Sequence, residues 1–302
     1  MTQPDPHSTP YTERPAWQHR LLGHIQKLQA EHLAVLRQGY DTTPGGSDAP
    51  VHAWRARLRA VAATRDEAET RARALGIGRV DILVSQTLGM AGYQPDPPAD
   101  PVRDSMIDGV AADVWQLQHM AALHTVHQGR PAEQAFFLGA NPGDAEQVER
   151  NMHALWRRAG GVAAAIGLTA DEYAGMWTTD AAGWRRIFAA SVDRYDEDGI
   201  EERWRVYAWP GIEIAADREV AALGSSAARR EAVDPVPIPT PATMLSHALE
   251  EHARSGVDYA TVTEAIDAAL EKAFGRDWTG TDTAHDPGTT PQSPDPAAEP
   301  EP

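Results

Sequence analysis

The first regular pattern of apolar residues begins at Trp17 and predicts a helix that ends near Gly39. One face of this helix would carry apolar side chains at spacings of four and three residues, namely Leu21, Ile25 and Leu28. The polar, proline-rich residues before position 16 show no such pattern, and residues 42–50 have the composition of a loop. We therefore expect the ordered part of the chain to begin with one amphipathic helix.

Residues 51–90 contain the next two predicted helices, which are joined at Gly76. The buried side of the first helix is marked by Trp54, Leu58 and Val61. The sequence TRDE at 64–67 matches a capping box, so we expect the helix to restart there and to end before Gly76. Residues 80–84 (VDILV) alternate as a strand would, but no partner strand occurs nearby, so we predict a short helix.

The strongest apolar patterns lie between residues 107 and 224. One long helix is predicted from Ile107 to about Gln128. The next begins at Asp144 and is interrupted at residues 160–161, a Gly-Gly pair whose cost we expect a kink or a close helix approach to offset. Later helices are predicted to begin at the capping residues Thr169, Asp180 and Asp198. This part of the chain is expected to form most of the core.

Together these patterns predict an all-α protein: a multi-helix bundle with a C-terminal helical hairpin after a proline-rich spacer, and with disordered termini. The expected parts are a lead-in (1–15), a helical bundle domain (16–224), a proline-rich linker (225–240), a helical hairpin (241–276) and a disordered acidic tail (277–302).

Composition narrows the class of protein. Apolar residues make up 42% of the chain, enough for a core, and the net charge of −17 argues against a protein that coats nucleic acid or anionic lipid. The absence of cysteine excludes disulfides, thiolate metal sites and cysteine nucleophiles. No apolar run approaches the roughly 18 residues of a membrane-spanning helix, and the first residues lack the features of a secretory signal. We therefore expect a cytoplasmic protein with no membrane partner.

Residues 65–88 are spaced as in a helix-turn-helix motif, with a small residue, a turn glycine and an apolar residue at Ala72, Gly76 and Ile82. Seven arginines and three acids lie between residues 51 and 80, and the candidate DNA contacts are Arg55, Arg57, Arg59 and Arg79. The motif would, however, place Leu83 and Val84 in the groove, where polar side chains are expected. A DNA-associated regulator is therefore one alternative, and an ordinary corner between two helices is the other.

Histidines on two predicted neighbouring helices suggest a metal site. The candidate ligands are His124, His127, Glu149 and His153. Histidines three residues apart share one helix face and could bind one ion. The spacing nonetheless differs from the Glu-x-x-His pairs of di-iron bundles, and His124 also continues an apolar stripe. A metal-dependent bundle enzyme therefore stays open beside the simpler interpretation, a hydrogen-bonded core histidine.

The C-terminal pair of helices is the basis of the functional prediction. Two short helices cannot bury much surface alone, so their apolar residues must pack against the bundle, a second copy or another protein. These residues are Met244, Leu245, Leu249, Val262, Ile266, Leu270 and Phe274. Sequence motifs of phosphate-binding loops, dinucleotide-binding folds and serine hydrolases are absent. We therefore predict a non-enzymatic protein-interaction module that needs no cofactor and binds another protein or itself.

Overall fold

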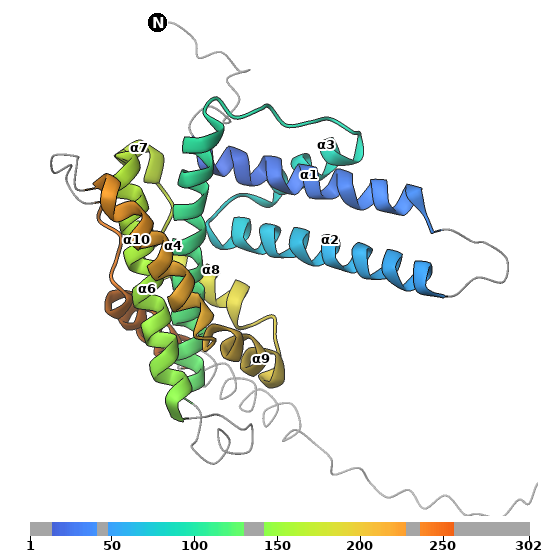
Figure 1. Cartoon of the computed structure of the whole chain (residues 1–302). Helices are drawn as coiled ribbons and strands as arrows, with labels where there is room; N and C mark the ends of the chain where they lie inside the picture. The colour runs from blue at the N-terminus through green and yellow to red at the C-terminus, as the bar shows by residue number, and fades with distance from the viewer. Residues whose placement is uncertain (1–13, 41–47, 130–141, 228–235, 257–302) are drawn as a thin grey trace, which may run out of the picture. The chain divides into compact units, whose positions relative to one another are not determined.

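The computed structural model describes residues 14–40, 48–129, 142–227 and 236–256 (Figure 1). Every regular element in these ranges is a helix and no strand occurs in them, so the predicted all-α, multi-helix bundle is confirmed. The chain divides into two units, Met1–Arg254 and Ser255–Pro302, and nearly all of the described residues belong to the first. No helix in the described ranges combines the length and the apolar character needed to cross a membrane.

The first three helices form one group in which α1 packs against both of the others. They are α1 (Ala16–Gln38), α2 (Ala49–Ala74) and α3 (Arg79–Met90), and Figure 1 shows α1 beside α2. Helix α2 is continuous, so the predicted restart at 64–67 is wrong. Instead of capping a new helix, the Thr64 hydroxyl donates to the Ala60 carbonyl one turn earlier (3.0 Å).

The corner between α2 and α3 has the geometry that the turn glycine predicts. Gly76 has φ +80°, a left-handed conformation that side chains with a Cβ disfavour. The Ile77 amide then donates to the Ala72 carbonyl (2.9 Å) and closes the end of α2. Residues 80–84 lie inside α3, so the predicted short helix is confirmed there, and Ile82 is buried as expected.

Helix α6 lies between α4 and α10 and forms the other large packing layer. The three helices are α4 (Pro101–Gln128), α6 (Pro142–Ile166) and α10 (Gly211–Ala227). Helix α6 runs unbroken through Gly160 and Gly161, so the predicted interruption is wrong. A Cβ on Gly161 would lie 3.7 Å from Leu223 Cδ1 of α10, an ordinary contact distance, so α10 packs against α6 at this glycine.

Three shorter helices complete this part of the bundle: α7 (Ala170–Tyr173), α8 (Ala181–Ser191) and α9 (Glu197–Tyr207). The predicted capping box at Thr169 is present, and the predicted cap Asp180 accepts from the Gly183 amide (2.6 Å). The cap of α9 is Asp196, which accepts from the Gly199 amide (2.9 Å). That helix therefore begins before the predicted start at Asp198, because Asp196 is the carboxylate in capping position.

Residues 236–256 contribute a short non-helical segment and a helix over 241–256. Ile238 is buried, and its carbonyl accepts from the Trp156 indole of α6 (3.2 Å). The helix packs on α8, where His247 and His252 lie beside the rings of Trp184 and Phe188. The predicted second helix of the hairpin and the acidic tail lie outside the described residues.

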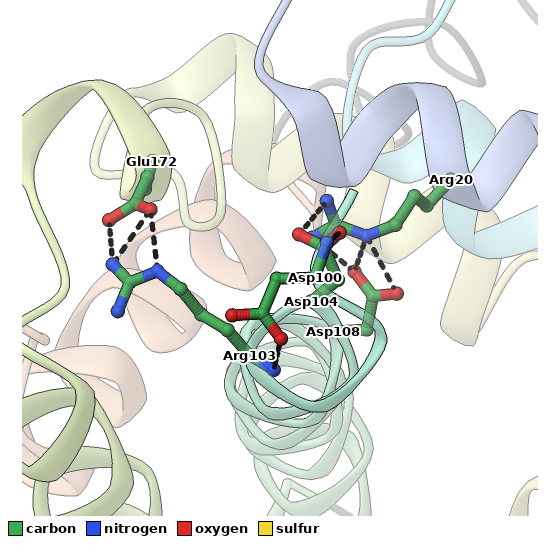
Figure 2. Close-up of polar contacts among 6 residues, drawn as sticks. All are labelled: Arg20, Asp100, Arg103, Asp104, Asp108 and Glu172. Carbon is green, nitrogen blue, oxygen red and sulfur yellow. Dashed lines mark hydrogen bonds and ion pairs between the residues drawn. The ribbon is translucent and has the colours of Figure 1, made fainter. Parts of the chain in front are cut away.

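Arginine side chains fasten α1 and α7 to the start of α4 (Figure 2). Arg20 of α1 lies between Asp104 and Asp108 of α4, with nitrogen–oxygen distances of 2.8 Å to each carboxylate. Arg103 of α4 binds Glu172 of α7 (2.8 Å). Burial alone would raise the pKa of Glu172, but hydrogen bonds from Arg103 and Thr169 lower it below its ordinary value. The Arg20 contacts thus connect the group α1–α3 to α4, and the Arg103 contact connects α7 to α4.

Candidate interaction surface on helix α3

Helix α3 packs with its apolar side outward. The residues that it buries against its neighbours are Ile82, Ser85 and Gly89. The large apolar residues of the opposite side are exposed, with exposed fractions of 72% for Val80, 48% for Leu83, 40% for Val84 and 37% for Leu88. These four residues fall at positions i, i+3, i+4 and i+8, so they form one stripe along the helix. We call this stripe the outer face of α3.

Close contact with α1 explains why α3 is turned this way. A Cβ on Gly89 would lie 2.3 Å from the Gln26 carbonyl oxygen, a distance that no real side chain could occupy. The two helix backbones therefore meet at Gly89, and only a small residue can lie between them. Ser85 is buried one turn earlier, on the same side. Because the small residues set the contact, the larger Val and Leu side chains point away from α1.

The outer face of α3 carries no charged side chain. The carboxylate of Asp81, at one edge of the stripe, forms an ion pair with Arg14 (2.6 Å). Arg79 is exposed at the N-terminal end of the helix, and Met90 and Tyr93 extend the exposed apolar surface at the C-terminal end. An apolar stripe of this kind, with charges only at its edges, is typical of protein-binding surfaces.

The four arginines proposed for DNA binding are exposed, but the neighbouring helix does not present polar readers. Arg55, Arg57 and Arg59 project from α2, where Arg57 lies 3.5 Å from Glu31 of α1. Arg79 begins α3, whose outer face is apolar. The arrangement is that of a corner between packed helices, and the DNA-binding interpretation stays a prediction.

Another arginine of α2 lies where a helix-turn-helix would require an apolar side chain. Burial lowers the pKa of Arg71 to about 10, and the carboxylates of Asp108 and Asp113 oppose this shift. The side chain is half-buried, and the acids of α4 favour its charged form. Arg71 is therefore part of the packing between helices.

The predicted metal ligands are only partly brought together. His124 Nε2 lies 3.7 Å from Glu149 Oε1, but His153 is exposed on α6. His127 stacks on Trp204 of α9 (ring centroids 3.5 Å apart) and lies 3.3 Å from the buried carboxylate of Glu201. Among the described residues, no three side chains of His, Asp or Glu form a group that could hold a metal ion.

The histidines of α4 instead belong to a buried aromatic cluster with α9. His124 Nδ1 accepts from the Trp204 indole (3.3 Å), and burial lowers the pKa of His124. His119 Nδ1 lies 2.6 Å from the Tyr207 hydroxyl, and burial lowers the pKa of His119 to about 3. Burial also raises the pKa of Tyr207. Both rings of the His119–Tyr207 pair are therefore neutral near pH 7, as expected for core packing.

Three of the seven predicted C-terminal binding residues lie in the described part of the chain. Met244 is buried and Leu245 is half-buried, because the helix packs on the bundle, whereas Leu249 is 61% exposed. The remaining residues, Val262, Ile266, Leu270 and Phe274, lie outside the described residues. Of the apolar surface predicted here, the structure thus describes one exposed leucine.

Sequence reasoning missed the outer face of α3 as a candidate binding surface, although the signal was present. Leu83 and Val84 were identified as the residues that a helix-turn-helix would point outward, and they counted only against DNA binding. The signal is a strip of small residues, Ser85 and Gly89, which lie four residues apart on the opposite side of the helix. Comparison with protein-family models, curated proteins and solved structures found no match to this chain.

Proposed function

We propose that this chain is a protein-interaction module that binds another polypeptide through the outer face of α3. The observation that supports this proposal is the reversed orientation of the helix: Ser85 and Gly89 face the core while Leu83 and Val84 face solvent. Burying apolar surface contributes about 25 cal/mol per Å². A helix that leaves most of its large apolar side chains outside therefore has free energy available for binding.

Two features make this face better suited to a polypeptide than to nucleic acid. Its centre has no charge, whereas a DNA-binding helix needs polar side chains at that position. The stripe also has the i, i+3, i+4 spacing with which helices pack against each other through their side-chain ridges. The exposed Leu249 offers a smaller apolar area at a different place. It supports a secondary contact rather than the main one.

The proposal can be tested by placing a photo-crosslinking amino acid at Leu83 in the native host. Val206 of α9 is a matched control because it is another exposed apolar side chain on a helix. We expect one polypeptide to be captured reproducibly from position 83 and not from position 206. After purification, that polypeptide should bind the chain. The substitution Leu83→Asp should lower the affinity at least about tenfold, whereas Val206→Asp should leave it unchanged.

Two results would contradict the proposal. One is equal, unselective crosslinking from positions 83 and 206. The other is a purified complex whose affinity is unchanged by Leu83→Asp. If Leu249→Asp reduced the affinity instead, the binding surface would be the C-terminal helix, as the sequence alone predicted.

A further inference from the structure

We infer that the outer face of α3 binds the same face of a second copy of this chain, with the two α3 helices antiparallel about a two-fold axis near Val84. This inference rests on the proposed function and names the partner. In such a contact each residue of one copy meets a symmetry-related residue of the other, so the face must complement itself. The stripe meets this condition in its spacing, its charge and its size.

The spacing of the stripe matches an antiparallel copy of itself. Val80, Val84 and Leu88 are separated by four residues each and form one ridge. Ridges of this i±4 type pack into the grooves of an identical helix in the commonest class of helix crossing. With Val84 at the two-fold axis, Val80 of one copy meets Leu88 of the other. Side chains of similar size thus face each other along this ridge, and Leu83 lies beside it.

The charges at the ends of the stripe favour the antiparallel orientation. Arg79 lies at the N-terminal end of α3, and Met90 lies at its C-terminal end on the same edge of the stripe. Antiparallel pairing places each Arg79 beside Met90 of the second copy and close to the C-terminal end of its helix, which carries partial negative charge. Parallel pairing would place the two Arg79 guanidinium groups together. Asp81, the other charged residue in the first turn, is already paired with Arg14, so Arg79 favours the antiparallel orientation.

The size of the surface is sufficient for a specific but modest association. The exposed apolar residues on and next to α3 are Val80, Leu83, Val84, Leu88, Met90 and Tyr93. A set of this kind is comparable to the roughly 300–600 Å² of the largest apolar patch on a monomeric protein. Two such patches together bury about 1,000 Å², the lower limit for a specific interface. We therefore expect a reversible dimer with a dissociation constant in the micromolar range.

Sedimentation equilibrium of the full-length chain across the micromolar range tests the association. We expect a monomer–dimer equilibrium that Leu83→Asp weakens at least about 100-fold, because one substitution removes the contact twice in a two-fold interface. Val206→Asp has the same chemistry at another exposed helical site and should leave the equilibrium unchanged. Circular dichroism confirms that both variants are folded, as expected for exposed positions.

The absence of cysteine makes the orientation directly measurable. Under mild oxidation Val84→Cys should form a disulfide-linked dimer, because the two side chains meet near the axis. A mixture of Val80→Cys and Leu88→Cys proteins should form the mixed dimer, while Val80→Cys alone should not. Val206→Cys should stay monomeric. Efficient crosslinking of Val80→Cys with itself would show a parallel contact and overturn the antiparallel arrangement.

A chain that remains monomeric throughout this range, or a dimer that Leu83→Asp does not affect, would overturn the inference. The proposed function fails separately. If the chain is monomeric but a different polypeptide is crosslinked at position 83 and loses affinity with Leu83→Asp, the face is an interaction surface whose partner is another protein. If neither a second copy nor any other polypeptide binds there, both proposals fail together.

Discussion

Helices α3 and α4 depart from the usual distribution of polar and apolar residues in opposite ways. Helix α4 buries polar side chains, among them Asp113, Gln118 and His119, whereas α3 exposes Leu83 and Val84. Asp113 accepts from Arg158, the Gln118 amide nitrogen donates to the Thr178 carbonyl, and His119 lies within hydrogen-bond distance of Tyr207. Only the Gln118 amide oxygen, among the atoms of these three side chains, is buried without a partner in the described residues. The described part of the chain offers no cover for the apolar stripe of α3.

This difference separates residues that stabilise the fold from residues that indicate a function. A buried polar group that is hydrogen-bonded within the chain is explained by the fold. An exposed apolar stripe has no such explanation, because water does not compensate for it. Buried titratable groups are often taken as signs of an active site, but in α4 they are part of the core. This contrast is the reason that our proposal rests on the surface of α3.

The largest effect is expected from the ion pair between Asp113 of α4 and Arg158 of α6. Arg158 binds Asp113 through two hydrogen bonds, of 2.9 and 2.5 Å, and their side chains are 19% and 9% exposed. Arg158→Ala leaves the Asp113 carboxylate without its main partner and should reduce the free energy of unfolding by about 3 kcal/mol. Urea denaturation measures this loss.

The adjacent residue of α6 provides the control for this prediction. Arg157 pairs with Asp217 at 2.8 Å, but both side chains are about half-exposed. Arg157→Ala should therefore change stability by less than about 0.5 kcal/mol. Equal losses of stability for the two variants would show that the Asp113–Arg158 pair is no better shielded from water than a surface pair. The contrast between the buried polar groups of α4 and the exposed apolar groups of α3 would then have no basis.

A second, smaller effect is expected from the protonation of His119. Burial holds its pKa at about 3 in the folded protein, whereas the unfolded chain should show about 6.5. Below pH 6.5 the unfolded state binds a proton that the folded state does not, so stability falls as the pH falls. Between pH 6.5 and pH 5 this group should cost about 2 kcal/mol.

The pH dependence of the urea unfolding midpoint, compared between wild type and His119→Gln, isolates this contribution. Glutamine can still hydrogen-bond Tyr207 but does not titrate, so the variant should lose stability less steeply below pH 6.5. Above pH 7 the two curves should run parallel, because neutral histidine predominates in both states. Parallel curves down to pH 5 would mean that His119 takes up a proton in the folded protein and is not a fixed part of the core.

The smallest effect is expected where α3 meets α1. Gly89→Ala forces a Cβ against the Gln26 carbonyl and should cost between about 1 and 2 kcal/mol. Gly109 of α4 is a helical glycine with no atom within 4 Å of its Cβ position, so Gly109→Ala should instead add a few tenths of a kcal/mol or more. Urea unfolding separates the two outcomes. A stable Gly89→Ala protein would show that α3 is not held by backbone contact.

The sequence predicted most of the fold because the helices are strongly periodic and carry recognisable caps. The corner at Gly76 and the caps at Thr169 and Asp180 could be assigned from residue type and spacing alone. Two predicted breaks, at residues 64–67 and 160–161, were wrong for a common reason. A capping pattern or a glycine pair ends a helix only if tertiary contacts do not stabilise the continuous helix. Those contacts cannot be read from one sequence.

The candidate site was harder to predict because either side of α3 could have been the buried one. By apolar periodicity the side with Leu83 and Leu88 is the natural core side. The side with Ser85 and Gly89 faces inward instead because α1 approaches so closely that only small residues fit. This choice depends on the distance between two helices, which residue types alone do not determine. The histidines of α4 are buried beside α9, and the metal-site interpretation stays a prediction.

The backbone contact at Gly89 also limits the conformational entropy that α3 can lose on binding. A helix seated directly on its neighbour has little conformational freedom left to lose, so the entropic penalty of association falls mainly on the incoming molecule. The thermodynamic signature should then be simple: a negative change in heat capacity that scales with the apolar area removed from water, with little contribution from refolding of α3 itself.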